Sequence, residues 1–249
     1  MILRTAACTD VGLRRRANED CYALAPDLGL YLVADGMGGH KAGQMASQLA
    51  TEAAVQAVQS LQGAVVGLAE LLRHAVTCAN REILRTAEAR PELAGMGTTL
   101  VAVLVGDDRL ALAHVGDSRA YIVRSGEIRA LTDDHSVVGE LIRRREITED
   151  AARSHPHRHV LTRALGVRPS TEPDLAEITP EVGDTLVLCS DGLTTHLRDE
   201  EIAGAVTACL DLQDGCDALI EHAKRRGGVD NITVVLLRFE NDGEAPTAS

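Results

Sequence analysis

Five acidic positions at the ends of aliphatic, strand-like segments are the feature that most constrains the fold of this chain. They are Asp20, Asp35, Asp117, Asp191 and Asp230, each inside a short polar motif. Desolvation and like-charge repulsion both oppose an ionised carboxylate at a buried strand end. A hard divalent cation resolves this conflict, because such ions take oxygen ligands from carboxylates, backbone carbonyls and water. The pattern therefore predicts one or more divalent cations in a site that distant parts of the chain share.

Strand-like and helix-like segments come in blocks along the chain. Segments rich in Val, Leu and Ile predict strands at 30–34, 98–105, 109–115, 120–124, 185–189 and 232–239. Ser125-Gly126 and Gly106-Asp107-Asp108 are typical of hairpin turns, so we expect antiparallel pairing. Amphipathic helices are predicted at 42–61, 68–87, 199–209 and 214–226. Blocks favour antiparallel sheets over a doubly wound parallel sheet. We expect an α+β fold, a four-layer α-β-β-α sandwich of two antiparallel sheets flanked by helices.

One domain should contain residues 1–240, because acidic positions in both halves of the chain can share a site only if both halves fold together. The polar segment 133–163 carries short helical patterns with a thin apolar stripe. We expect it to be a mobile flap over the site. Residues 241–249 are small and polar, and predict a C-terminal tail.

Charge and cysteine content narrow the partners and the compartment. The net charge of −12 argues against a nucleic-acid partner, because phosphate binding needs basic stripes. No apolar run approaches the roughly 20 residues that span a bilayer, so no membrane insertion is expected. Scattered cysteines and the lack of a signal peptide indicate a reduced, cytoplasmic setting. Cys189 lies in an apolar strand and is interpreted as a core residue.

Seven motifs follow one another in a recognisable order between about residues 5 and 240. They are Thr9-Asp10-Val11-Gly12 with Arg15 and Asn18-Glu19-Asp20, Val33-Ala34-Asp35-Gly36-Met37-Gly38-Gly39-His40, Gly95-Met96-Gly97-Thr98-Thr99, His114-Val115-Gly116-Asp117-Ser118-Arg119, Leu161-Thr162-Arg163-Ala164-Leu165-Gly166, Ser190-Asp191-Gly192 and Gly228-Val229-Asp230-Asn231. The series resembles the metal-dependent protein phosphatases, the type 2C serine/threonine phosphatases, in their bacterial form. One such motif would be weak evidence, whereas seven in order are specific.

The resemblance implies a centre with two Mn²⁺ or Mg²⁺ ions. Its carboxylates would be Asp20, Asp35, Asp191 and Asp230. Asp35 would bridge the ions, the backbone carbonyl of Gly36 would be a further ligand, and Glu19 would act through coordinated water. Such ions keep several waters and need few protein ligands. Paired ions would generate a bridging hydroxide near neutral pH, and this hydroxide would attack phosphorus in line.

Arg15 is the phosphate clamp that the resemblance implies, since it precedes Glu19 by four residues as it does in the family. A planar guanidinium can hold two phosphate oxygens at once. The alternative is a solvated basic turn formed by Arg14, Arg15 and Arg16.

Asp117 has two interpretations. In the family, the matching aspartate helps to hold a weaker third metal, together with an aspartate four residues after Asp191. Thr195 occupies that position here, so a third site should be weak. The alternative for Asp117 is a structural role, as a salt bridge to Arg119 or a cap.

The sequence does not decide which group donates a proton to the leaving oxygen. Met37 stands where some relatives have a histidine, and a thioether cannot donate a proton. A metal-bound water or His40 are the candidates.

The histidine-rich segment 155–159 has two interpretations. Three of its five residues are histidines, and imidazole is a zinc ligand, but no fourth ligand is near in sequence. A solvated flap loop is the preferred interpretation.

The expected function is hydrolysis of phosphoserine and phosphothreonine in proteins, in one step and without a phosphoenzyme. By resemblance the chain would oppose a eukaryotic-like bacterial serine/threonine kinase, and we expect a monomer. One alternative is a low-activity pseudophosphatase that binds a phosphoprotein or regulator, for which only Thr195 speaks. A metal-dependent nuclease is disfavoured by the acidic charge and the lack of aromatic or basic tracks.

Overall fold

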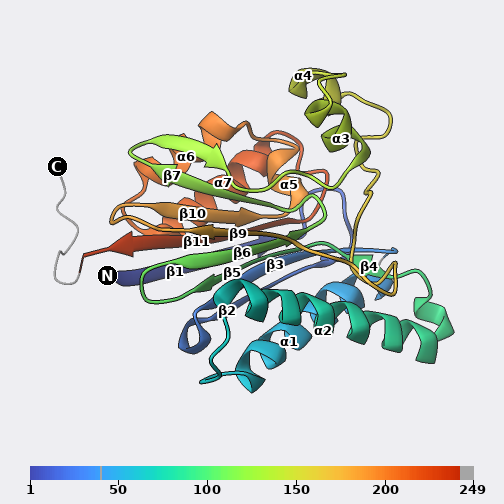
Figure 1. Cartoon of the computed structure of the whole chain (residues 1–249). Coiled ribbons are helices and arrows are strands. Elements are labelled where there is room, and N and C mark those ends of the chain that lie inside the picture. Colours follow the sequence, from blue (N-terminus) through green and yellow to red (C-terminus); the bar gives the residue numbers. More distant parts are fainter. Residues whose placement is uncertain (40, 242–249) are drawn as a thin grey trace.

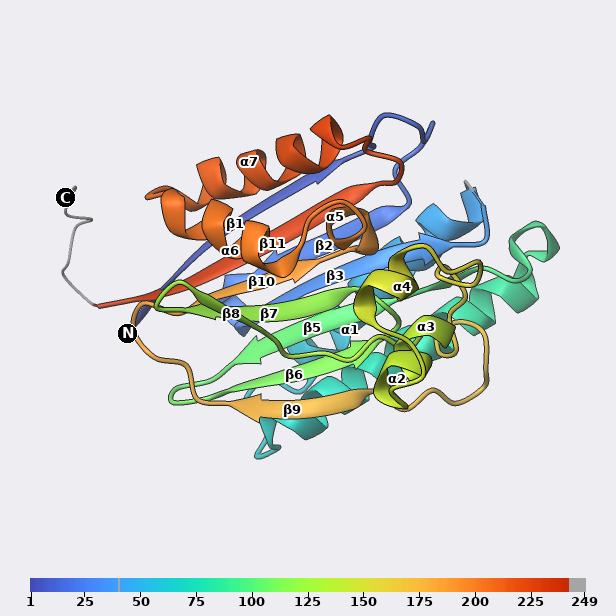
Figure 2. The same cartoon turned by 90° about the horizontal axis from the view of Figure 1, so that it is seen from above.

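Two antiparallel sheets pack face to face, and helices cover both outer faces (Figures 1 and 2). The computed structural model describes residues 1–39 and 41–241. The predicted four-layer α-β-β-α sandwich is therefore confirmed. His40 and residues 242–249, which hold a proposed acid and most of the predicted tail, lie outside the described residues.

The first sheet has the strand order β1-β11-β10-β7-β8, with antiparallel neighbours throughout. Its strands are β1 (Ile2–Asp10), β11 (Ile232–Glu240), β10 (Thr185–Cys189), β7 (Arg119–Arg124) and β8 (Glu127–Ala130). Ser125 and Gly126 join β7 to β8 with φ angles of 53° and 81°. Positive φ at both central positions is the geometry of a tight hairpin turn, so that predicted turn is confirmed.

The second sheet has the order β2-β3-β5-β6-β9, and a short strand β4 pairs with the end of β3. Its strands are β2 (Asp20–Ala25), β3 (Leu30–Met37), β4 (Gly97–Thr98), β5 (Leu100–Val105), β6 (Leu110–Val115) and β9 (Asp174–Ile178). The sequence did not predict β1, β2 or β9. All three are edge strands, and only one of their residues, Ala6, is fully buried, so they lack the apolar runs of the central strands.

Alternate residues of the central strands enter two different cores. In β3, Leu30, Leu32 and Ala34 face the helices, whereas Tyr31 and Val33 face the other sheet. A strand buried on both faces needs apolar residues at every position, which explains its continuous aliphatic run.

Each outer face of the sandwich carries a pair of helices. The helices α1 (Lys41–Ser60) and α2 (Leu68–Ala89) cover the second sheet, and α6 (Asp199–Ala208) and α7 (Leu212–Arg225) cover the first. The described part of the chain has no helix long and apolar enough to cross a membrane.

The short elements gather near one end of the sandwich or in its connections. They are α3 (Val137–Arg143), α4 (Glu149–Arg153), α5 (Asp191–Thr194), η1 (Pro26–Leu28) and η2 (Pro91–Leu93). In Figure 1, α3 and α4 stand apart from the layered body, at the end where β10 passes into α5. The side-chain oxygens of Ser136 and Thr148 cap these two helices by accepting backbone N–H bonds.

Candidate metal centre

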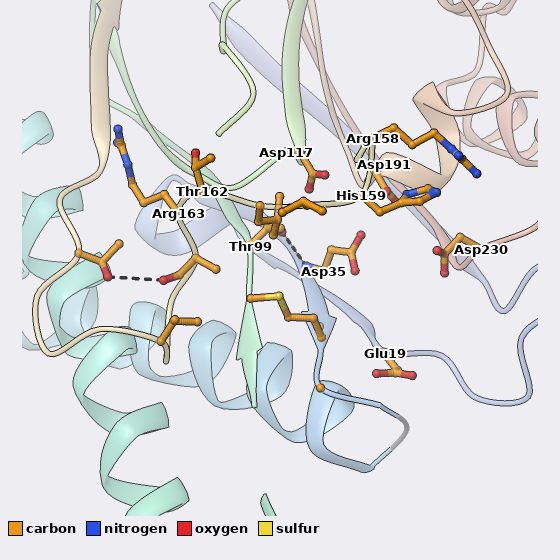
Figure 3. A pocket seen from close by; sticks show the side chains of 18 of the residues that line it. Glu19, Asp35, Thr99, Asp117, Arg158, His159, Thr162, Arg163, Asp191 and Asp230 are labelled. Carbon is orange, nitrogen blue, oxygen red and sulfur yellow. Dashed lines mark hydrogen bonds between the residues drawn. The ribbon is translucent and has the colours of Figure 1, made fainter. Parts of the chain in front are cut away.

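The five acidic positions meet at one end of the two sheets. Asp20 opens β2 directly opposite Asp35 of β3, Asp117 lies between β6 and β7, Asp191 follows β10, and Asp230 precedes β11. In antiparallel sheets the end of one strand lies beside the start of its neighbour, so these positions share an edge. Figure 3 shows Asp35, Asp117, Asp191 and Asp230 around a common space.

That space is a cavity of about 1430 Å³, and these same four carboxylates line it. Glu19, Gly36, Arg14 and Arg15 also contribute to its wall. Small-molecule sites usually occupy about 300–1,000 Å³. A wider, open cavity suits a substrate side chain that is presented by a larger molecule.

Burial and mutual repulsion oppose ionisation of these carboxyl groups. Burial, then the charges of Asp20 and Asp191, holds the pKa of Asp35 well above its usual range. Burial is also the main cause that raises the pKa of Asp191 to about 7 and that of Asp20 to about 6. The pKa of Asp117 is raised by burial first and by the charge of Asp191 second. A cation placed among these groups would reverse the balance in favour of the ionised forms.

Asp20 is held by hydroxyl groups on one side only. Its Oδ2 accepts hydrogen bonds of 2.7 Å from Ser190 Oγ and from Thr233 Oγ1. Its Oδ1 is buried and has no hydrogen-bond partner in the described part of the chain. Because buried polar atoms are nearly always paired, this oxygen marks a place for a cation or for water bound to one.

The donor set fits a hard, hydrated ion. The carboxylates that converge here offer oxygen ligands, which Mg²⁺ and Mn²⁺ prefer. Across residues 1–39 and 41–241, no three His, Cys, Asp or Glu side chains form a complete ligand set around one point. The fit to such an ion therefore rests on the carboxylate oxygens and on the buried Oδ1 of Asp20.

Two threonines fix the backbone of Asp35 and leave its carboxylate to the cavity. The Asp35 N–H donates to Thr99 Oγ1 at 3.0 Å (Figure 3), and its carbonyl accepts from Thr98 Oγ1 at 2.8 Å and from the Thr99 N–H at 2.9 Å. Ser118 Oγ lies 2.6 Å from Thr99 Oγ1. The motifs at 95–99 and 114–119 therefore position Asp35, a role that the sequence analysis did not assign.

Close packing of β3 on α1 requires glycine beside the centre. A Cβ atom on Gly36 would lie 2.1 Å from the carbonyl oxygen of Gly43, and one on Gly43 would lie 1.9 Å from Glu19 Oε2. Glu19 is only 6% exposed, and its carbonyl accepts from the Gly36 N–H at 3.1 Å and from Ser47 Oγ at 2.6 Å. These contacts hold β3, α1 and Glu19 together at the wall of the cavity.

Arg15 lies at the Asp230 wall of the cavity. Its Nη2 donates to Asp230 Oδ2 at 2.7 Å, and this bond is the main cause that raises the pKa of Arg15 above its usual value. The charges of Glu19 and Asp191 add to this effect. A guanidinium has five N–H donors, so a bond to Asp230 leaves others for an anion in the cavity.

Asn231 ties three segments of the site together. Its Oδ1 accepts from the Glu19 N–H at 2.8 Å, and its Nδ2 donates to the carbonyls of Val11 and Ala17 at 2.9 and 3.0 Å. One buried amide therefore fixes the loop that carries Arg15. Sequence reasoning missed this role, since a turn dipeptide gives no sign of which backbone groups its side chain will meet.

Asp117 does not pair with Arg119, so the predicted salt bridge is wrong, whereas the role of Asp117 as a cap stays a prediction. Arg119 donates two bonds of 2.8 Å to Asp134 instead, from Nε and from Nη2. A second cavity of about 250 Å³ contains Asp117, Asp191 and Thr195 in its wall. Its further carboxylates are Asp133, Asp134, Glu149 and Asp199. The sequence analysis named none of these four as a site residue.

The histidine-rich segment divides into two parts. Arg158 and His159 line both cavities, whereas His155 and His157 line neither and stack loosely with ring centroids 5.6 Å apart. No zinc-ligand group forms here within the described residues. Cys189 is fully buried, and burial raises the pKa of its thiol to about 12, as expected for a core residue.

Comparisons with known proteins agree with this geometry. Residues 7–232 match the family model described as Protein phosphatase 2C. The chain is 38% identical over 234 residues to the serine/threonine phosphatase stp of Listeria monocytogenes, covering 92% of this chain and 93% of that protein.

Two solved structures show the same likeness. The first is the serine/threonine phosphatase PstP/Ppp of Mycobacterium tuberculosis, with 41% identity, a TM-score of 0.89, and 97% and 100% of the two chains covered. The second is the PstP catalytic domain in complex with two manganese ions, with 39% identity, a TM-score of 0.85, and 96% and 99% covered.

Proposed function

The chain belongs to the protein phosphatase 2C family and is a protein serine/threonine phosphatase, and from this premise we propose how its own residues carry out the hydrolysis. The observation that carries the proposal is the convergence of carboxylates from both halves of the chain on one cavity. The two manganese ions in the PstP structure support a two-metal centre.

Side chains at the sheet ends would hold two Mn²⁺ or Mg²⁺ ions. The carboxylates that would hold them are Asp20, Asp35, Asp191 and Asp230. The carbonyl of Gly36 would be a further ligand, and Glu19 would act through water. When bound, such ions lower the pKa of water enough to provide hydroxide near neutral pH for an in-line attack on phosphorus.

Arg15 would bind the phosphate. Its position beside Asp230 places a permanent positive charge at the wall of the cavity, where a phosphate dianion needs one. A planar guanidinium also orients the phosphate through two parallel bonds, which an ammonium does not do. Orientation of this kind contributes much of the catalysis in phosphoryl transfer.

Asp117 would help to hold a weak third ion. It lines the second cavity together with Asp191, and Thr195 lies in the same wall without a charge to offer. We therefore assign the third site a low affinity.

We also propose a domain organisation, a role for the flap and a partner kinase. Residues 1–240 would be one catalytic domain, with 133–163 as a flap that helps to select phosphorylated proteins. A eukaryotic-like bacterial serine/threonine kinase would phosphorylate the proteins that this phosphatase dephosphorylates.

Deleting the phosphatase should then raise phosphorylation at the sites of that kinase. An unchanged level of phosphorylation would refute this link between the two enzymes.

The test is hydrolysis of a phosphothreonine peptide while Mn²⁺ is titrated. Asp35→Asn and Asp191→Asn should each lower kcat by at least about 100-fold, because each removes a charge that holds the metal. Asp107→Asn, an exposed aspartate in a hairpin turn, is the matched control and should retain full activity.

Chelation should abolish turnover, and Mn²⁺ should restore it. Turnover that persists in chelator or in both variants would contradict the metal assignment. A metal-loaded wild type that binds the phosphopeptide without hydrolysing it would support the pseudophosphatase instead.

A further inference from the structure

Two buried histidines lie between the loop that carries Asp117 and the wall of the main cavity. His114 is in β6, and His135 lies two residues before the start of α3. Each is only 1% exposed, and their rings pack with a centroid distance of 4.4 Å. Neither histidine lines either of the two cavities described above. Buried polar side chains are nearly always paired, so the partners of His135 indicate what it does.

The imidazole of His135 has a partner at each of its two nitrogen atoms. The Gly116 N–H donates to Nδ1 at 3.1 Å. Nε2 lies 3.1 Å from Asp174 Oδ2, a contact that is close but not aligned as a hydrogen bond. Because an N–H group donates to Nδ1, that nitrogen has a free lone pair, and the proton of the neutral ring is on Nε2, facing the carboxylate. Burial is the main cause that lowers the pKa of His135, which agrees with a neutral ring.

The backbone of His135 makes two further hydrogen bonds. Its N–H donates to the carbonyl of Gly116 at 2.7 Å, and its carbonyl accepts from the Thr162 N–H at 2.8 Å. Ser136 and Leu161 form an isolated bridge directly beside these bonds. The chain before α3 is therefore fixed both to the residue next to Asp117 and to the segment that returns from the flap.

Asp174 extends these contacts into the main cavity. Its Oδ1 accepts a hydrogen bond from Arg163 Nη1. Thr162, Arg163 and Asp174 all line the main cavity, and we call these three residues the substrate-side wall. In the view of Figure 3, Thr162 and Arg163 lie above Asp35, as Asp117 does. His135 thus lies between Asp117 and the substrate-side wall and contacts the chain on both sides.

Resting on the proposed function, we propose that His135 is a positioning residue that holds Asp117 and the substrate-side wall in one arrangement. Nδ1 holds the amide next to Asp117, which would help to bind the weak third ion, and Nε2 attracts Asp174 of the wall. An imidazole of one tautomer makes both contacts at once, whereas an amide side chain reaches only one of the two places. Loss of one contact should therefore affect metal binding, and loss of the other should affect substrate binding.

Two variants separate the contacts. His135→Asn places its side-chain oxygen near the position of Nδ1, so it keeps an acceptor for the Gly116 N–H and loses the contact to Asp174. His135→Gln places an amide N–H near the position of Nε2, so it keeps a donor for Asp174 and loses the acceptor for Gly116. His222→Gln is the matched control, because His222 is an exposed histidine of α7 that lines neither cavity.

The two variants should differ in the Mn²⁺-dependent hydrolysis of a phosphothreonine peptide. His135→Gln should raise the Mn²⁺ concentration for half-maximal activity by about tenfold and leave KM unchanged, because partners behind a metal ligand set its affinity. His135→Asn should raise KM by about fivefold at saturating Mn²⁺ and leave the Mn²⁺ requirement unchanged, because the wall loses a polar contact. Calorimetry of Mn²⁺ binding without substrate should show a weaker last binding step in His135→Gln alone.

A measurement on the metal-free wild type tests the placement of His135 without any activity. Nitrogen-15 NMR of the imidazole should show one neutral tautomer with its proton on Nε2. A proton on Nδ1, or exchange between the two tautomers, would overturn the proposal. A fall in kcat for both variants with no shift in the Mn²⁺ requirement or in KM would also overturn it, since a purely structural histidine would behave in this way.

A further variant keeps the test decisive if the His135 variants do not fold. Asp174→Asn changes a side chain that is 54% exposed, so the fold should tolerate it, and it should reproduce the rise in KM. An unchanged KM in Asp174→Asn would overturn the proposal. A wild type that shows the expected tautomer but hydrolyses no phosphopeptide would overturn the proposed function, and the two failures are therefore distinguishable.

Discussion

Thr195 is the residue at which this chain departs from the metal pattern that its motifs imply. Its side chain is exposed in the second cavity, beside Asp117 and Asp191. Thr195→Asp should add a carboxylate ligand to the proposed third site. We expect the Mn²⁺ concentration for half-maximal activity to fall by about tenfold. Peptide hydrolysis across a Mn²⁺ titration measures this shift.

A control separates the site from a general charge effect. Thr207→Asp adds the same charge on the exposed face of α6, away from both cavities, and should leave the titration where it was. If Thr195→Asp leaves the Mn²⁺ requirement unchanged or increases it, Thr195 is not the position of a missing ligand. The neighbouring Asp133, Asp134 and Asp199 would then be repelling an added charge.

Charge and strand position were enough to predict from the sequence which acidic residues meet at the strand ends, and their role as metal ligands stays a prediction. Asp20, Asp35, Asp191 and Asp230 are examples, because an acid at a buried strand end stays ionised only beside a positive charge. Asn231 was not predicted as a site residue. The side chain of Asn231 acts through hydrogen bonds to Glu19, Val11 and Ala17, which are more than 200 residues away along the chain. Such contacts exist only in the folded molecule.

A salt bridge connects β7 to the segment before α3, and its contribution to the free energy of unfolding can be measured. Arg119 of β7 holds Asp134 through two bonds of 2.8 Å, and both side chains are largely buried. Arg119→Ala should lower the free energy of unfolding by about 2–4 kcal/mol, because it leaves Asp134 without its partner. Denaturant titration of the metal-free protein measures this loss.

Arg109→Ala is the comparison for that measurement. Arg109 pairs with Asp108 and Glu177, but all three side chains are about half exposed or more. Exposed pairs contribute little, so we expect a change of at most about 1 kcal/mol. If Arg119→Ala and Arg109→Ala lower the free energy of unfolding equally, the salt bridge between Arg119 and Asp134 does not stabilise the fold.

Elements with a strong apolar pattern were predicted closely, and those without one were missed. The helix predicted at 68–87 is observed as Leu68–Ala89, and the strand predicted at 185–189 has the same bounds in the structure. The edge strand β9, Asp174–Ile178, has a charged first residue and no fully buried one. Its pairing with β6 decides its conformation, and that pairing is not visible in a local pattern.

At the scale of the whole molecule, the buried carboxylates set how stability depends on pH. A folded-state pKa above the unfolded value means that the folded protein binds the proton more tightly. Stability therefore rises as pH falls through the folded pKa. Asp191, with a pKa of about 7, and Asp35, with a pKa raised well above its usual range, act in this way. His114 acts in the opposite direction, because burial lowers its pKa to about 3. Below about pH 6.5 its imidazole takes up a proton in the unfolded chain but stays neutral in the folded protein, so a falling pH favours unfolding.

The metal-free protein should therefore become more stable as pH falls from about 8 to about 6.5, before the buried histidine begins to oppose the trend. A gain of about 1 kcal/mol corresponds to a rise of about 2–4 °C in the unfolding midpoint for a chain of this size. Asp191→Asn should reduce this slope, since its amide does not titrate. Saturating Mn²⁺ should abolish or reverse it, because metal binding requires the ionised carboxylates and strengthens as pH rises. Thermal unfolding across this window measures all three. A midpoint in the metal-free wild type that stays level or drops as pH decreases would mean that the carboxylates do not repel one another as their positions imply.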